Sequence, residues 1–119
     1  MKYAMLVYSD QSDWEALSEE EAATAREESM PKWIALFEEF GKADPSVQGR
    51  ELEAASEAKV VRVVDGRTVV TDGPYAETKE QLGGVFVTEL ADLDEAIRIA
   101  ALIPAAEYGT LEIRPLRAM

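Results

Sequence analysis

Two kinds of apolar pattern divide the chain. Short runs rich in β-branched and aromatic residues predict β-strands, and two longer stretches with an apolar residue every three to four positions predict amphipathic helices. We expect strands at residues 2–8, 47–52, 59–64, 67–71, 85–90 and 108–114. The first of these is apolar at both alternating sets of positions, which predicts a central strand that is buried on both faces.

Side-chain signals mark where the first helix begins and ends. Ser18 followed by Glu21 is a capping-box pattern, so we expect the helix to begin there. Pro31 interrupts the apolar stripe and predicts a kink or a restart, and Gly41 predicts the end of the helix. The aromatic residues of the stripe, such as Trp33, are interpreted as core rather than as a ligand-stacking surface.

Similar signals mark the second helix and one hairpin. Asp92 followed by Glu95 predicts a second capped helix, and Pro104 predicts its end. Asp65-Gly66 lies between two strand-like runs and is a typical two-residue hairpin turn. The strands on either side of this turn are therefore expected to pair.

The order of the elements predicts the fold class. Two helices separated by strands that are mostly hairpin-connected indicate an α+β domain, with an antiparallel sheet and both helices on one face. The order suits a ferredoxin-like split βαβ arrangement with an added β-hairpin. At 119 residues we expect one domain, spanning 1–119.

The apolar character of the strands also predicts a homodimer. The strands at 2–8 and 85–87 are apolar on both sides, yet two helices cover only one face of a sheet. A second copy of the chain is the simplest cover for the other face. We therefore expect two copies to associate sheet to sheet.

Composition removes several classes of function. The net charge of −12 opposes binding to nucleic acid, because no basic patch can neutralise phosphates. No apolar run reaches the about 18 residues of a membrane span, and the N-terminus lacks the features of a secretion signal. No nucleic acid and no membrane are expected as partners, and the cytoplasm is the expected location.

The absence of cysteine and histidine restricts the chemistry further. Thiolate nucleophiles and zinc–thiolate sites are excluded, and any acid–base chemistry is left to carboxylates, Lys, Tyr or a cofactor. No loop has the ligand spacing of a Ca²⁺ or Mg²⁺ site, and no glycine loop has dinucleotide- or phosphate-binding spacing. We expect neither a cofactor nor a metal ion.

The stretch 72–84 is the most distinctive part of the chain. It reads Asp-Gly-Pro-Tyr-Ala-Glu-Thr-Lys-Glu-Gln-Leu-Gly-Gly and lies between two expected strands. It opens on a tight-turn signal and closes on two glycines, where the backbone is expected to bend or to pass another segment closely. Its density of polar residues makes it the first place to look for a site.

This stretch resembles a known family signature. Residues 72–80 are similar to the signature of the DGPF branch of the YCII-related proteins, with Tyr75 where Phe is usual. The opening strand, the close at 82–84, the helix start at 92–96 and residues 103–106 leading into 112–115 also resemble that family. The resemblance covers nearly the whole chain, and it implies a ferredoxin-like, dimeric α/β-barrel fold with a pocket beside the dimer interface.

The resemblance carries functional expectations as well. Some YCII-type relatives have a His–Asp pair proposed as an acid–base dyad, and enzymes of related fold include dehydrochlorinases and muconolactone isomerases. Because this chain has no histidine, the dyad cannot be carried over, and Asp72 stands without its usual partner. DGPF-type members often accompany genes for extracytoplasmic-function sigma factors.

Three residues of the stretch are candidate catalytic residues. Asp72 would be a usable acid or base if burial at the dimer cleft raised its pKa. Lys79 could place a positive charge near an enolate or carboxylate, and Tyr75 offers a hydroxyl. The structural alternatives are that Asp72 only caps its own turn, that Glu77, Lys79 and Glu80 form a solvated face, and that Tyr75 replaces Phe with its tip in water.

Three weaker candidates and two functions complete the predictions. Tyr3, Tyr8 and Arg62 are weaker candidates to line a ligand-binding pocket on the sheet face.

The first function is an isomerase, lyase or dehydrohalogenase acting on a small organic molecule at the dimer interface, with Asp72 as proton-transfer group. The second is a non-catalytic ligand-binding or regulatory module associated with an extracytoplasmic-function sigma factor. The missing histidine favours the second without deciding between them, and a purely structural dimer is a third alternative.

Overall fold

Four strands form the main sheet of the domain. In the computed structural model, which describes residues 1–118, β1 (Lys2–Ser9), β2 (Gln48–Glu51), β5 (Gln81–Glu89) and β6 (Thr110–Pro115) pair in the order β2-β5-β1-β6. All three pairings are antiparallel. This order is compatible with a ferredoxin-like fold, and the predicted α+β class with an antiparallel sheet is confirmed.

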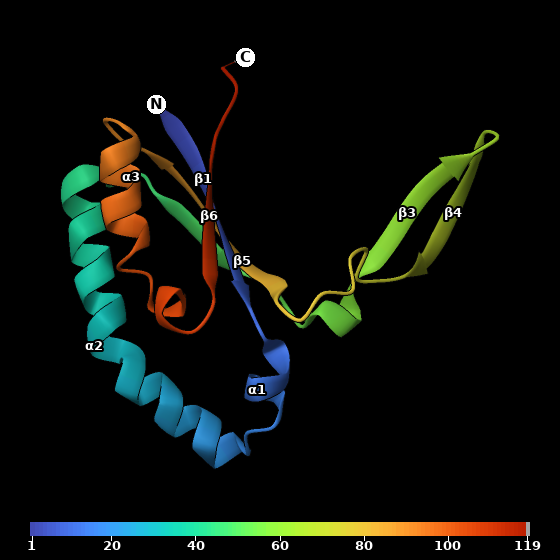
Figure 1. The fold of residues 1–119 in the computed structure, drawn as a ribbon, viewed down its shortest axis with the longest axis horizontal. Helices are drawn as coiled ribbons and strands as arrows, with labels where there is room; N and C mark the ends of the chain where they lie inside the picture. Colours follow the sequence, from blue (N-terminus) through green and yellow to red (C-terminus); the bar gives the residue numbers. More distant parts are fainter. Residues whose placement is uncertain (119) are drawn as a thin grey trace.

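The long helix α2 (Glu19–Ala43) begins where the capping-box pattern predicted. The Ser18 hydroxyl accepts a hydrogen bond from the Glu21 N–H at 3.1 Å, and the Glu21 carboxylate accepts one from the Ser18 N–H at 3.0 Å. The helix changes direction along its length but continues through Pro31, so no restart occurs (Figure 1). The end expected at Gly41 was wrong, because the buried Phe40 holds the last turn against the sheet and outweighs the modest helical cost of glycine.

Two shorter helices complete the α-helical part. In α3 (Leu93–Ala100), the Asp92 carboxylate caps the helix by accepting from the Glu95 N–H at 2.9 Å, as predicted. The helix ends at Ala100, before the expected stop, and Pro104 instead begins the 3₁₀ turn η2 (Pro104–Glu107). The helix α1 (Gln11–Glu15) has no periodic signal in the sequence, because it has only five residues and none of them is buried.

The hydrophobic core lies between α2, α3 and one face of the four-stranded sheet (Figure 1). Tyr3 and Met5 of β1 point into it, because alternate residues of a strand face opposite sides of a sheet. The buried apolar residues are Tyr3, Met5, Leu36, Phe40, Phe86, Leu90, Ala96, Ile99, Ala100, Ile103 and Ala105.

The other side of the main sheet carries no helix. The residues on it are called the open sheet face here, and they include Ala4, Leu6 and Tyr8 of β1 and Val85 and Val87 of β5. Ala4 pairs with Val87, and Leu6 pairs with Val85, so these four side chains are cross-strand neighbours. The centre of this face is therefore apolar and uncovered within the chain, while its edge strands add polar and charged residues such as Arg50 and Glu112.

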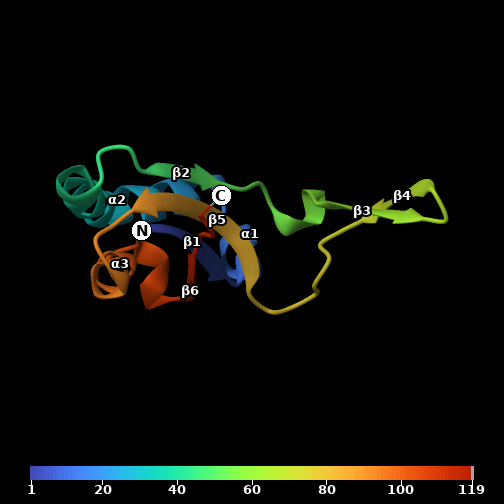
Figure 2. The same cartoon turned by 90° about the horizontal axis from the view of Figure 1, so that it is seen from above.

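The predicted hairpin forms a separate two-stranded sheet, called the arm here. It consists of β3 (Lys59–Val64) and β4 (Arg67–Asp72). Asp65 and Gly66 both have positive φ, at 50° and 76°, as the two-residue turn requires. The arm extends away from the rest of the domain in both views (Figures 1 and 2). The radius of gyration is therefore 16.5 Å, whereas a compact chain of this length has about 13.5 Å.

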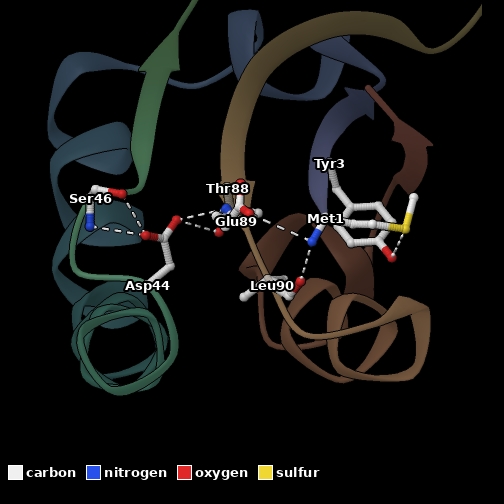
Figure 3. Close-up of polar contacts among 7 residues, drawn as sticks. All are labelled: Met1, Tyr3, Asp44, Ser46, Thr88, Glu89 and Leu90. Carbon is white, nitrogen blue, oxygen red and sulfur yellow. Dashed lines mark hydrogen bonds and ion pairs between the residues drawn. The ribbon is translucent and has the colours of Figure 1, made fainter. Parts of the chain in front are cut away.

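A buried carboxylate joins the end of α2 to strand β5. One oxygen of Asp44 accepts from the N–H and hydroxyl of Ser46 at 3.1 and 2.6 Å. The other accepts from the Thr88 hydroxyl at 2.9 Å and the Glu89 N–H at 2.8 Å (Figure 3). Burial raises the pKa of Asp44, but the hydrogen bonds from Ser46, Glu89 and Thr88 outweigh it and hold the pKa below its ordinary value.

Candidate functional site

A shallow hollow of about 490 Å³ lies between α1, the 3₁₀ turn η1 (Ala55–Glu57) and residues 73–81 of the distinctive stretch. It opens widely to solvent, and most of the residues that line it have polar side chains. Three segments that are far apart in the sequence supply its walls. The lining residues are Asp10, Gln11, Ser12, Glu15, Ala55, Ser56, Gly73, Pro74, Glu77, Thr78, Lys79 and Gln81.

Asp10 fixes the first wall by capping α1. Its carboxylate accepts from the hydroxyl of Ser12 at 2.5 Å and from the backbone N–H of Ser12 at 3.0 Å. These two bonds, and the positive charge of Lys79, hold the pKa of Asp10 below its ordinary value. Asp10 is therefore a carboxylate at neutral pH, and it lies within electrostatic range of the one cationic side chain that lines the hollow.

A single hydrogen bond joins α1 to η1. The side-chain carbonyl of Gln11 accepts from the backbone N–H of Ala55 at 2.9 Å, across 44 positions of sequence. The same side chain approaches β5, since its amide nitrogen lies 3.6 Å from the position a Cβ on Gly83 would take. Gln11 thus holds two walls of the hollow at a fixed separation.

The third wall is the loop between β4 and β5. The Gln81 amide donates to the carbonyls of Ala76 and Thr78 at 3.0 and 2.9 Å, and the Thr78 hydroxyl donates to the Glu80 carbonyl at 2.5 Å. Gly73 closes the base of the arm, with its N–H donating to the Ala58 carbonyl at 2.8 Å. A Cβ on Gly73 would lie 2.9 Å from that of Ala58, so only glycine fits this approach.

The distinctive stretch ends earlier than the sequence predicted. Strand β5 begins at Gln81 rather than at 85, so Gln81–Gly84 are strand residues rather than loop. Glu80 is tied to β6 by a hydrogen bond from the Thr110 hydroxyl at 2.8 Å. The loop proper is therefore short, and it is fixed at both ends by the strands it joins.

Charge in the hollow is mostly negative. The carboxylates of Asp10, Glu15 and Glu77 line it together with the ammonium group of Lys79. Uncharged donors and acceptors come from Ser, Thr and Gln side chains. The carboxylates can therefore accept hydrogen bonds from a ligand, or pair with its positive group, at several points. The Lys79 ammonium can donate to one acceptor group of the ligand.

The three candidate catalytic residues lie at different places. Lys79 lines the hollow. Asp72 is at the base of the arm, where its side chain is 84% exposed and forms an ion pair with Lys59 across the hairpin. Tyr75 is 77% exposed, with the Arg62 guanidinium 5.6 Å from its ring centre. The structure brings Arg62 and Tyr75 together outside the hollow, and it does not place Asp72 within it.

The two tyrosines among the weaker candidates lie on opposite sides of the main sheet, and Arg62 lies on the arm. Tyr3 is in the core at 2% exposure, with its hydroxyl donating to the Met1 sulfur at 3.6 Å. Tyr8 is on the open sheet face, and its hydroxyl donates to the Glu112 carboxylate at 3.3 Å. Tyr3, Tyr8 and Arg62 therefore do not meet in one pocket of this chain.

Sequence reasoning missed the α1 side of the hollow. Asp10, Gln11 and Glu15 come from the segment between the first expected strand and the first expected helix, for which no helix or strand was predicted. The available signal was Asp10 followed by Ser12 and Asp13, which is a helix-capping pattern even for a short helix. Nothing local in the sequence indicates that Gln11 reaches Ala55.

Two classes of feature are absent from the part of the chain that the structure describes. In residues 1–118 no group of three or more Asp or Glu side chains is arranged to hold a metal ion. None of the described helices has both the length and the apolar composition needed to cross a membrane.

The fold and the hollow together define a class of protein. This is a small α+β domain with one sheet face left open and a shallow hollow beyond the end of β1 and the start of β5. The chain belongs to the YCII-related family, whose domain matches residues 1–119. It is 39% identical over 118 residues to an uncharacterized protein of Rhizobium meliloti (strain 1021), covering 98% of this chain and 92% of that protein. The family resemblance is confirmed, and assignment to the DGPF branch stays a prediction.

Proposed function

We propose that this protein is a homodimeric binding module for a small polar organic molecule, which it holds in the hollow beside Lys79. The observation that carries the proposal is the hollow itself, whose three walls are fixed by hydrogen bonds before any ligand arrives. Pre-formed walls reduce the ordering cost of binding. Regulation by occupancy of such a site requires no chemical step.

The position of Asp72 supports binding over proton transfer by that residue. A general acid or base must come within hydrogen-bond reach of the proton that it moves. Asp72 is outside the set of residues that line the hollow, and its carboxylate is paired with the Lys59 ammonium in solvent. The isomerase, lyase or dehydrohalogenase hypothesis, with Asp72, Tyr75 and Lys79 in catalytic roles, stays a prediction with less geometric support.

The charges of the hollow favour one chemical class of ligand. Three carboxylates repel a molecule whose only charge is negative, while they accept donors from an amine or from hydroxyl groups. Lys79 provides one donor of its own for a carbonyl or carboxylate oxygen. The ligand class that fits is therefore an amine-bearing or zwitterionic small molecule rather than a simple organic acid.

The open sheet face supports the homodimer. The described chain has 8718 Å² of accessible surface, against about 6,400 Å² for a compact monomer of its mass. The excess of about 2,300 Å² reflects the extended arm and the uncovered sheet face. Apolar cross-strand neighbours such as Leu6 and Val85 lie on the uncovered side, where a second copy would remove them from water.

The proposal is tested by ligand-induced stabilisation. Libraries of amines, zwitterions and carboxylic acids would be compared by thermal shift, and hits would be confirmed by calorimetric titration. Binding at about one hundred times Kd stabilises the folded state by about 2.7 kcal/mol. Lys79→Ala and Asp10→Asn should weaken the confirmed ligand, whereas Lys59→Ala, a lysine outside the hollow, should not. Hits whose affinity is unchanged by Lys79→Ala and Asp10→Asn would place the binding site elsewhere.

A link to an extracytoplasmic-function sigma factor is the finer part of the regulatory hypothesis. It rests on the family resemblance of residues 72–80, and it stays a prediction. A direct test is whether the dimer retains a sigma factor encoded beside it, with and without the confirmed ligand.

A further inference from the structure

Each face of the arm carries three valines, and one of the two faces is the more exposed. Cross-strand pairing places Val61 opposite Val70 and Val63 opposite Thr68, so these side chains share one face of the hairpin. Val61, Val63 and Val70 are 62%, 71% and 58% exposed. The three valines are called the valine face here. An isolated two-stranded hairpin is only marginally stable in water, so this face needs a surface to pack against.

The opposite face of the arm also carries three valines. Arg62 lies opposite Val69, Thr71 lies opposite Val60, and Val64 lies opposite Arg67. The Arg62 guanidinium stacks over the ring of Tyr75 on the loop that follows the arm. Val64 and Val69 on this face are 51% and 40% exposed, so the valine face is the more exposed of the two.

The place of the arm in the fold indicates what covers it. In both views α2 and α3 lie on one side of the main sheet, and the arm extends from the opposite side, beyond the open sheet face (Figures 1 and 2). A body seated on the open sheet face would therefore lie beside the arm. The arm and the open sheet face therefore lie on the same side of the main sheet (Figures 1 and 2).

We propose that the arm packs its valine face on a second copy of this chain. The inference rests on the proposed homodimer and adds a second contact to it. A second copy on a two-fold axis would cover the open sheet face and the valine face of both chains at once. Neither surface then needs an unrelated partner.

Charge is consistent with contact between copies. The arm carries three basic residues, Lys59, Arg62 and Arg67, and two acidic ones, Asp65 and Asp72, so its net charge is +1. Since the whole chain carries −12, the remainder carries −13. An arm from one copy therefore approaches a strongly acidic body of the other without net repulsion.

Contact between the arm and a second copy should also hold one wall of the hollow in place. Gly73 and Pro74 line the hollow and directly follow the last residue of β4. The Gly73 N–H donates to the Ala58 carbonyl at the base of the arm, so this wall moves with the arm. The second copy therefore fixes part of the ligand site, and ligand binding and arm docking should strengthen each other.

Hydrogen exchange at different protein concentrations tests the inference. Below the dimer dissociation constant, the amides of β3 and β4 should exchange at rates close to those of an open hairpin. Above it, they should slow by at least about tenfold, while the amides of β1 and β5 report that the body stays folded. Val63→Lys should abolish this slowing and weaken dimerisation by about tenfold or more. Thr71→Lys, the same charge on the opposite face, should preserve both.

The outcomes separate the two proposals. Arm amides that exchange freely in a sample shown by sedimentation to be dimeric would overturn the arm contact and leave the dimer in place. Arm amides that are equally protected in a monomeric sample would also overturn it, because the arm would then pack on its own chain. A chain that is monomeric at every concentration would overturn the homodimer, and the arm contact with it.

Discussion

The side chain of Gln11 accepts a hydrogen bond from the backbone of Ala55 at 2.9 Å, which joins α1 to η1 across the candidate site. The bond joins two elements that are 44 positions apart in the sequence. It connects the segment after β1 with the segment before the arm, and the hollow lies between them. The contact turns three separate pieces of chain into one site.

Removal of this bond should loosen the hollow. Gln11→Ala leaves the Ala55 N–H without its partner, which should lower the free energy of unfolding by about 1 kcal/mol. Ligand affinity should fall as well, because two walls are no longer held apart at a fixed distance. Gln11→Glu keeps an acceptor at the same place and should restore most of the stability in urea unfolding. Equal stability of wild type and Gln11→Ala would show that the bond does not hold these walls together.

Asp44 should make the fold sensitive to acid. Its pKa is lower in the folded protein than in the unfolded chain, so its stabilising contribution is present above the ordinary value of 3.8. That contribution is lost as the pH falls through the lower folded pKa. Asp44→Asn should lower the free energy of unfolding at pH 7 by about 1–3 kcal/mol, because the Thr88 and Glu89 donors lose a charged acceptor.

The Asp44 variant should also respond less to pH. Urea unfolding at pH 7 and at pH 3 should give a smaller difference for Asp44→Asn than for wild type. Asp13→Asn, at an exposed carboxylate of α1, serves as the matched control and should behave like wild type. An undiminished pH difference in Asp44→Asn would assign the acid sensitivity to other carboxylates.

The capping box at the start of α2 should contribute measurably to stability. Ser18→Ala removes the side-chain acceptor for the Glu21 N–H and should cost about 1 kcal/mol of unfolding free energy. Ser18→Asp keeps an acceptor at the cap and should recover most of the loss. Ser29, inside the same helix, offers a comparison position, where Ser29→Ala should be neutral or slightly stabilising.

The Asp72→Asn variant distinguishes the binding proposal from the hypothesis that Asp72 transfers a proton. Because its ion pair with Lys59 is exposed, Asp72→Asn should leave the unfolding midpoint unchanged within error. Under the binding proposal, the variant should also keep the affinity for a confirmed ligand. Turnover of any compound by wild type that is abolished in Asp72→Asn would instead support the proton-transfer role.

The sequence predicted the elements whose signals are local. Asp65-Gly66 sets its own turn, and Ser18 and Asp92 cap helices through residues three positions away, so these features could be read directly. The bent but continuous helix α2 matches the kink that Pro31 predicted, whereas its end at Ala43 instead of Gly41 could not be predicted locally, since it depends on packing of the buried Phe40.

The candidate site was only half visible in the sequence. Lys79 and Glu77 stand in a conspicuous stretch, and both line the hollow. Gln11 contributes through a contact 44 residues away, which no local pattern encodes. Asp72 was conspicuous for the same reason as its neighbours, but strand pairing with Lys59 carries it onto the arm.

The homodimer is the central claim, because it is the proposed cover for the open sheet face and for the arm. It is also proposed to fix one wall of the hollow. Sedimentation velocity across a dilution series is the most direct measurement. We predict a dimer of the 119-residue chain at micromolar concentration, converted toward monomer by Val87→Lys on the open sheet face. A wild-type chain that sediments as a monomer throughout the series would contradict the account.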